Sequence, residues 1–155
     1  MQTFFPLPSL KESAAVLDDQ RLNCQVKEAD QILDVLVLCR KHWGTRHPDG
    51  QHIAWSTHPA VLQWVGHEWL LIAYRNTMRN ERLRRGQNEQ RPLVGQIGFE
   101  PAKPWWHGDD RYHSSHRAAL LAKDFVHYSQ FNWHEQPALE YFWPVKHNER
   151  CIDEN

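Results

Sequence analysis

The segment from Asp19 to Lys41, which reads DQRLNCQVKEADQILDVLVLCRK, decides the fold. Apolar side chains recur in it at steps of three or four residues, a spacing that places them along one side of an α-helix. This stripe consists of Leu22, Val26, Ala29, Leu33, Leu36 and Cys39. We therefore predict a long helix over residues 19–41 with one buried side.

A second long helix is predicted after the loop that follows. That loop, HWGTRHPDGQHIAWSTHP, is rich in Gly, Pro and polar residues, which is typical of irregular structure. Thr57 can cap the new helix, Pro59 suits its first turn, and Gly86 is a common helix end. We expect the helix to run from about His58 to Arg85. Its inward-facing residues are expected to be Val61, Leu62, Val65, Trp69, Ile72 and Ala73.

Two further helices are indicated by capping residues. Ser9 and Glu12 have the spacing of a capping box, which predicts a short helix that ends near Leu17. Ser114 is expected to cap a third main helix that continues to Asp124. The buried side of that helix would carry Ala118, Leu120 and Leu121.

The remaining sequence supports an all-helical fold. No segment alternates between apolar and polar residues as a half-buried strand does. The tail from Tyr128 to Pro144 is aromatic and irregular, and the chain of 155 residues holds eight Trp, six Phe and four Tyr. We predict an all-α fold, a compact single domain over residues 1–155, with three main helices and long aromatic-rich loops.

Several sequence features argue against other classes of protein. The three cysteines, Cys24, Cys39 and Cys151, lie far apart and form no CxxC motif for zinc binding or thiol exchange. The N-terminus lacks the pattern of a secretory signal, and no apolar run is long enough to span a membrane. We expect a monomer in the reducing cytoplasm that uses neither a metal nor a diffusible cofactor.

The net charge of −1 hides an uneven distribution of charge along the chain. Basic residues gather between Tyr74 and Arg91, where Glu81 and Glu89 are the acidic ones. The arginines of this stretch are Arg75, Arg79, Arg82, Arg84, Arg85 and Arg91. The pattern predicts a local basic face that can attract phosphate.

A row of polar residues lies beside the apolar stripe of the first long helix. Arg21, Gln25 and Glu28 are spaced by four and three residues, so their side chains share one side of that helix. A carboxylate at the edge of a core, next to an arginine, can have a pKa tuned for catalysis. An ordinary surface salt bridge explains the same spacing.

The run LDDQRLNCQVKEADQIL, from Leu17 to Leu33, resembles the pyrimidine-dimer DNA glycosylases, the phage endonuclease type that incises ultraviolet-damaged DNA. The similarity continues through HPAVLQWVGHEWLLIAYRN, PWWHGDDRYHSSHRAALLAKD and HYSQF. The family's Asp-Gln pair and catalytic glutamate match Asp19, Gln20 and Glu28. The resemblance implies a DNA glycosylase, with an accompanying lyase activity at abasic sites, that acts on damaged or modified pyrimidines in double-stranded DNA.

The resemblance also implies a nucleophile, the N-terminal amine. An α-amino group titrates near 7.7–8.0 and is therefore far more often uncharged at neutral pH than a lysine. In this sequence the amine belongs to Met1, which is followed by Gln2 and Thr3 where the family typically has Thr directly after the initiator. The Met1 amine, an amine exposed by processing, or loss of the lyase step are the alternatives.

Binding of DNA by such an enzyme requires contacts to phosphates on both sides of the damaged nucleotide. For any single arginine, a solvated helix end is the competing interpretation. The candidate contacts are Gln20, Arg21, Lys27, Arg82, Arg84, Arg85, His116, Arg117 and Lys123.

Two motifs allow other interpretations. His113 and His116, with His107 nearby, suggest a metal site, but a chain with eleven histidines has such pairs without one. Trp105 and Trp106 suggest base stacking, although core packing is the more common role of such a pair. A DNA-binding module without catalysis and a metal-dependent nuclease therefore remain the rival functions.

Overall fold

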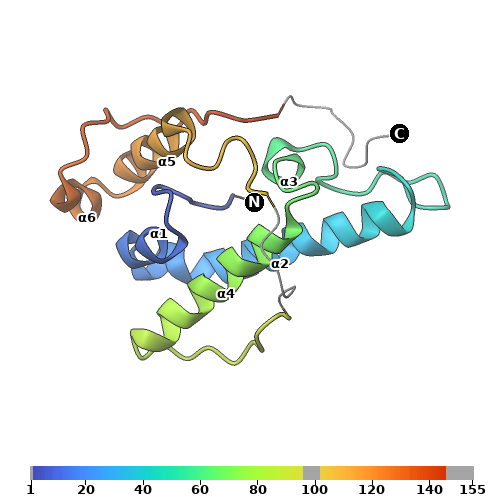
Figure 1. Cartoon of the computed structure of the whole chain (residues 1–155), viewed down its shortest axis with the longest axis horizontal. Helices are drawn as coiled ribbons and strands as arrows, with labels where there is room; N and C mark the ends of the chain where they lie inside the picture. Colours follow the sequence, from blue (N-terminus) through green and yellow to red (C-terminus); the bar gives the residue numbers. More distant parts are fainter. Residues whose placement is uncertain (1, 96–101, 146–155) are drawn as a thin grey trace.

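The computed structural model describes residues 2–95 and 102–145, which are arranged as helices joined by long connections (Figure 1). These ranges contain no strand, only an isolated bridge between Arg46 and His52. The all-α prediction is confirmed. The elements are α1 (Leu10–Val16), α2 (Asp19–Lys41), α3 (Pro59–Leu62), α4 (Glu68–Arg84), α5 (Asp110–Lys123), α6 (Phe125–Tyr128) and the 3-10 turn η1 (Ser129–Phe131).

Helices α1 and α2 form where the sequence predicts them. The hydroxyl of Ser9 accepts a hydrogen bond from the Glu12 backbone N–H and caps α1. The carboxylate of Asp18 does the same for Arg21 at the start of α2. The predicted stripe of α2 is buried except that Leu33 is half-buried, and the neighbouring Ile32 is buried instead.

The predicted helix from His58 to Arg85 is wrong, because the chain forms two helices there. Gly66 adopts a φ of +75°, a left-handed conformation that interrupts the helical hydrogen-bond ladder. The cap is also one residue later than expected, since the His58 ring rather than Thr57 accepts from the Ala60 N–H.

The break changes which side of α4 is buried. Tyr74 and Met78 are fully buried, whereas the predicted Ile72 and Ala73 are only half-buried. A continuous helix would have carried the α3 stripe forward unchanged, but α4 starts afresh at Glu68. The helix from Ser114 is corrected too, because α5 begins at Asp110 and Asp109 caps it through the Arg111 N–H.

The N-terminal segment, residues 2–7, runs through the middle of the molecule. Figure 1 shows it extending from α1 across the helices, between α2 and α4 on one side and α5 on the other. Helices α2 and α4 pack along each other beneath it. The largest fully buried side chains nearby are Phe5, Trp64, Tyr74, Trp106 and Tyr112. The described helices are all too short or too polar to cross a membrane.

Candidate functional site

Phe4 is fixed in the core by hydrogen bonds from two helices. Its backbone N–H donates to the Gln25 side-chain oxygen on α2 at 2.9 Å. The Tyr74 hydroxyl on α4 lies 2.9 Å from the Phe4 carbonyl oxygen and 2.5 Å from the same Gln25 oxygen. Both Gln25 and Tyr74 are buried, so these contacts replace the water that would otherwise solvate the peptide groups.

Phe5 is held in the same way by two histidines of α5. Its N–H donates to His116 Nδ1 at 2.8 Å, and its carbonyl oxygen accepts from His113 Nδ1 at 2.7 Å. Burial lowers the pKa of His116 from 6.5 to about 3 and lowers that of His113 as well. Both rings are therefore neutral near pH 7, and each forms a hydrogen bond with the backbone of the N-terminal segment.

These contacts give His113 and His116 a structural role in place of the metal binding considered for His113 and the DNA contact predicted for His116. His113 is not free to bind a metal, because Nε2 accepts from the Gly108 N–H while Nδ1 is bonded to Phe5. His116 is fully buried, out of reach of a DNA phosphate. Among the described residues, no group of three potential ligands is close enough to hold a metal ion.

The N-terminal segment, held by these hydrogen bonds, places Gln2 beside Glu28. The Gln2 backbone N–H donates to Glu28 Oε2 at 3.1 Å, although the two residues are 26 positions apart. The second ring nitrogen of His116 lies 3.3 Å from the Gln2 side-chain amide and helps to fix this residue. Met1, the predicted source of the nucleophile, lies outside the described residues.

Beside this contact the surface is hollowed, with a volume of about 280 Å³. This Gln2 hollow brings together four residues that were predicted from the sequence, Gln20, Arg21, Glu28 and Lys123. They meet because the three on α2 share one side of the helix and Lys123 lies at the end of α5. The complete lining is Gln2, Phe4, Gln20, Arg21, Cys24, Gln25, Glu28, Lys123 and Tyr141.

Arg21 is held firmly at the rim of the Gln2 hollow. Its guanidinium donates to Asp18 at 2.7 Å and lies 3.8 Å from Asp124. Burial would raise the pKa of Asp18, but hydrogen bonds from Tyr128 and Arg21 outweigh it and lower that pKa. Arg21 is therefore oriented in advance, with part of its positive charge already neutralised.

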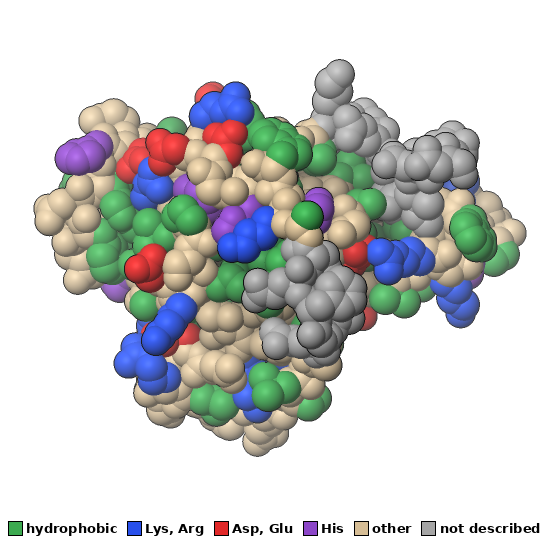
Figure 2. Space-filling view, in the orientation of Figure 1, with side chains coloured by type: hydrophobic (Ala, Val, Ile, Leu, Met, Phe, Trp, Pro, Cys, Tyr) green, Lys and Arg blue, Asp and Glu red, His purple; other side chains and the backbone are tan. Residues whose placement is uncertain are grey.

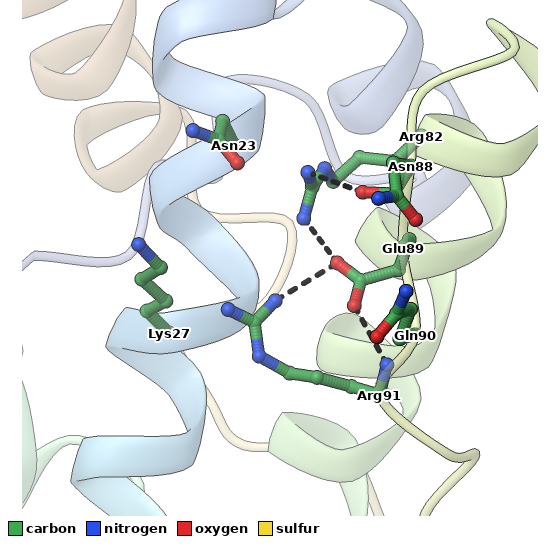
Figure 3. A pocket seen from close by; sticks show the side chains of 7 residues that line it. All are labelled: Asn23, Lys27, Arg82, Asn88, Glu89, Gln90 and Arg91. Carbon is green, nitrogen blue, oxygen red and sulfur yellow. Dashed lines mark hydrogen bonds and ion pairs between the residues drawn. The ribbon is translucent and has the colours of Figure 1, made fainter.

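Lys27 is among the residues that line a different hollow, between α2 and the loop after α4 (Figure 3), where its side chain runs along α2 on the side away from Arg82 and Arg91. In that view Arg82 and Arg91 both reach the carboxylate of Glu89. Arg82 is buried and donates to the Asn88 carbonyl oxygen as well. These contacts favour a structural role for Arg82, which ties the loop to α4.

Arg84 and Arg85 share the carboxylate of Glu81. Hydrogen bonds from Arg84, and further ones from Arg85, outweigh partial burial and lower the pKa of Glu81 to about 2. Arg85 also donates to carbonyl oxygens at the end of α1, those of Ala14, Ala15 and Leu17. Arg84 remains exposed, whereas Arg85 links two helices.

Arg117 is likewise engaged within the protein. Its guanidinium donates to the Pro6 carbonyl oxygen at 2.9 Å and pairs with Asp110 and Glu135. Like His116, it holds the N-terminal segment in place. On the face drawn in Figure 2, basic and acidic side chains are interspersed and form no continuous basic surface.

The two neighbouring tryptophans, for which core packing was the more common role, differ in burial. Trp106 is buried in the core, as expected, and Trp105 is 62% exposed. Tyr74, which anchors Phe4, was not identified as a site residue from the sequence. Its position on the apolar side of a helix indicates packing, and no local spacing relates it to Phe4.

A second, larger hollow of about 550 Å³ lies farther along α2. Glu28 lines this hollow as well as the Gln2 hollow, so the two hollows share this residue. We call it the Trp55 hollow. It is lined by Glu28, Gln31, Asp34, Val35, Leu38, His47, Ile53, Ala54 and Trp55.

Comparisons with known proteins identify the family of the chain. Residues 1–94, which include the N-terminal segment, α2 and Glu28, match the family model described as pyrimidine dimer DNA glycosylase. No curated protein and no solved structure gives a match. The matched region is more than half of the chain, and the chain therefore belongs to the pyrimidine dimer DNA glycosylase family.

Proposed function

We propose that the protein excises damaged or modified pyrimidines from double-stranded DNA with its N-terminal amine as nucleophile and then cuts the strand as a lyase. The observation that carries this proposal is the 3.1 Å contact between the Gln2 nitrogen and Glu28 Oε2. A chain start held beside a carboxylate, at the edge of a hollow, suits attack on a sugar carbon.

The first step replaces the base by the amine. The amine nitrogen forms a bond to the sugar C1′ while the bond from C1′ to the base breaks, and the base leaves with a proton. Positive charge develops on the sugar, and the Glu28 carboxylate stabilises it. Where the amine is that of Gln2, Glu28 also lies where it can accept a proton from the attacking nitrogen.

The second step cuts the strand. Opening of the sugar ring gives an imine between C1′ and the amine nitrogen. Removal of a proton from C2′ then expels the 3′ phosphate by β-elimination, and hydrolysis of the imine releases the enzyme. Each bond change uses only the DNA, water and the protein, so the proposal calls for no cofactor.

The reacting amine depends on where the mature chain begins. In a chain that starts at Met1, the amine belongs to Met1, one residue before the contact with Glu28. If Met1 is removed, the Gln2 nitrogen itself becomes the amine, within hydrogen-bond distance of the carboxylate. The intact mass of the purified protein distinguishes these two forms.

The DNA contacts that we propose surround the Gln2 hollow. Gln20, Arg21 and Lys123 line it, and Lys27 follows on the neighbouring side of α2. Lys27 and Lys123 form no ion pair within the described residues, so their charge is available to phosphate. Arg84, exposed at the end of α4, is a more distant candidate contact.

Replacement of Glu28 by Gln tests the proposal. The change keeps the shape and removes the negative charge, so single-turnover excision from a duplex with one thymine dimer should fall on the order of a hundredfold or more. DNA affinity should hold or rise, because a charge that repels phosphate is lost.

The matched control is Glu12→Gln, which removes an exposed carboxylate on α1. It should leave excision unchanged. Circular dichroism should show the same helical content for both variants and the wild type. A folded Glu28→Gln variant with near-normal excision would rule out the proposed mechanism.

A further inference from the structure

The end of α2 carries an exposed tryptophan where the backbone favours glycine. Trp43 adopts a φ of +52°, and the next residue, Gly44, closes the helix end by donating its N–H to the Cys39 carbonyl oxygen at 3.0 Å. Glycine is the usual residue at such a left-handed position, because a Cβ there crowds the following carbonyl oxygen. The indole of Trp43 is 86% exposed, so burial does not offset that cost. Neither local conformation nor packing explains a tryptophan here, and strain of this kind is kept mainly at functional sites.

The residues around Trp43 are basic. Lys41 and Arg46 are both exposed, whereas Arg40 is paired with Glu68 at 2.6 Å. We call residues 41–47 the Trp43 loop. It encloses a hollow of about 240 Å³, which is lined by His42, Trp43, Gly44, Thr45 and Arg46. An aromatic ring beside unpaired positive charge suits the backbone of a nucleic acid, because the charges attract phosphates and the ring packs against the sugars.

The Trp43 loop lies on the same side of α2 as Glu28. Glu28 and Leu38, both on α2, line the Trp55 hollow together with His47 of the loop. The His47 ring also contacts the His42 ring, with 5.2 Å between the centroids. Figure 1 shows the loop at the opposite end of the molecule from α6. The loop therefore extends the side of α2 that carries the proposed catalytic carboxylate.

The length of α2 determines where this loop would meet DNA. From Glu28 to the end of α2 at Lys41, a rise of 1.5 Å per residue gives roughly 20 Å along the helix axis. Successive base pairs of a duplex are 3.4 Å apart, so this distance corresponds to about six base pairs. Arg21 and Lys123 line the Gln2 hollow, nearer the start of α2. The Trp43 loop can therefore reach only one of the two arms of a duplex whose lesion lies at Glu28.

We propose that the Trp43 loop is a second DNA contact, which binds the sugar–phosphate backbone of undamaged duplex about six base pairs to one side of the lesion. This inference rests on the proposed function. Trp43 is too far from Glu28 to touch the reacting sugar, so its contribution is to binding and not to the chemistry.

Trp43→Gly separates a binding role from a structural one. Glycine suits the left-handed position, so urea denaturation should show a variant at least as stable as the wild type. Its affinity for a duplex with one thymine dimer and about twelve base pairs on each side should nevertheless fall about fivefold or more, the scale of one lost aromatic contact. Single-turnover excision at saturating enzyme should stay near the wild-type rate.

Duplexes with one shortened arm locate the contact. Two such duplexes keep the dimer and one long arm, and the other arm is cut to about three base pairs, on the 5′ side in one and on the 3′ side in the other. The wild type should bind one of them about fivefold more weakly than the other, because only one arm reaches the loop. Trp43→Gly should bind both with similar affinity, since the contact that the missing arm provides is already absent.

Two further variants test the charge and the specificity of the effect. Lys41→Gln should lower the slope of log affinity against log salt concentration by about one, as expected for one lost phosphate contact. Trp105→Ala removes another exposed tryptophan, one that lines neither the Gln2 hollow nor the hollow of the Trp43 loop. It should bind all three duplexes as the wild type does.

Several results would overturn the inference. Equal affinity of Trp43→Gly and the wild type for the long duplex would exclude Trp43 as a DNA contact. The same difference between the two shortened duplexes in both proteins would assign the arm contact to another part of the molecule. A wild type that is dimeric in solution, with a monomeric Trp43→Gly variant, would assign the indole to contact between two copies of the chain. If the wild type forms no borohydride-trapped imine on an abasic duplex, the proposed function itself fails, whereas trapping without any preference between the arms contradicts this inference alone.

Discussion

His116 shows how a single side chain can be essential to a site without contact with the substrate. Its ring is completely buried, and Nδ1 accepts the Phe5 N–H only while that nitrogen carries no proton. The same ring reaches Gln2, next to Glu28. Protonation of His116 would therefore break the support of the N-terminal segment.

This arrangement makes stability dependent on pH. The unfolded chain takes up a proton on His116 as the pH falls through 6.5, but burial delays uptake in the folded protein until about pH 3. Folding stability therefore falls as the pH drops from 6.5 toward 3, by about 2 kcal/mol at pH 5 from this residue alone. His113, whose pKa is also lowered, acts in the same direction.

Urea unfolding near neutral pH and near pH 5 measures the effect. His116→Asn keeps an acceptor close to the Nδ1 position but does not titrate, so it should be less stable than the wild type near neutrality and less sensitive to acid. His134→Asn, at an exposed position, should behave like the wild type. Equal acid sensitivity in His116→Asn and the wild type would contradict this role.

At the scale of helices, Arg85 joins α4 to the end of α1. It donates to three carbonyl oxygens that have no partner within the short helix α1, and it pairs with Glu81 and Asp19. Arg84 is the next residue toward the N-terminus and shares Glu81, but its side chain is 68% exposed. The two arginines should therefore differ strongly in their effect on stability.

We expect Arg85→Ala to lower the free energy of unfolding by about 2 kcal/mol, because several hydrogen bonds, three of them partly buried, are lost together. Arg84→Ala should change it by about 0.5 kcal/mol or less, as is usual for an exposed ion pair. Urea denaturation gives both values. Similar losses in the two variants would show that Arg85 does not hold α1.

The helices also show which parts of the fold a sequence pattern can predict. The spacing of Leu22, Val26 and Ala29 identified α2 because one helix buries one side along its whole length. The division between α3 and α4 was missed because Gly66 is compatible with a helix and adopts its left-handed conformation only in the folded context. Ser114 and Asp109 are both good capping residues, and the sequence alone does not show that the earlier one, Asp109, begins the helix.

At the scale of the whole molecule, the sequence predicted the part of the site that lies on a single helix, α2. Gln20, Arg21 and Glu28 meet because α2 alone sets their spacing. The contacts of Gln2 with Glu28 and of Phe4 with Tyr74 join residues 26 and 70 positions apart, and no local pattern specifies them. Folding around the N-terminal segment creates them.

The basic stretch from Arg75 to Arg91 shows that the sequence also does not predict which charges are paired in the folded protein. Its composition predicted a face for DNA, but the fold places carboxylates of Glu81, Glu89 and Asp30 against most of its arginines. Counts of charge along a sequence do not reveal such pairing. The DNA contacts that we propose therefore centre on Lys27 and Lys123, which form no ion pair within the described residues.

The central claim is that the amine at the start of the chain reacts beside Glu28. Borohydride reduction during reaction with an abasic duplex, followed by digestion and mass spectrometry, identifies the nitrogen that carries the DNA remnant. We predict the remnant on the N-terminal residue, Met1 or Gln2 according to the measured start of the chain. A short N-terminal extension should abolish trapping without loss of helical content. A remnant on Lys27 or Lys123, or trapping by the extended protein, would contradict the account.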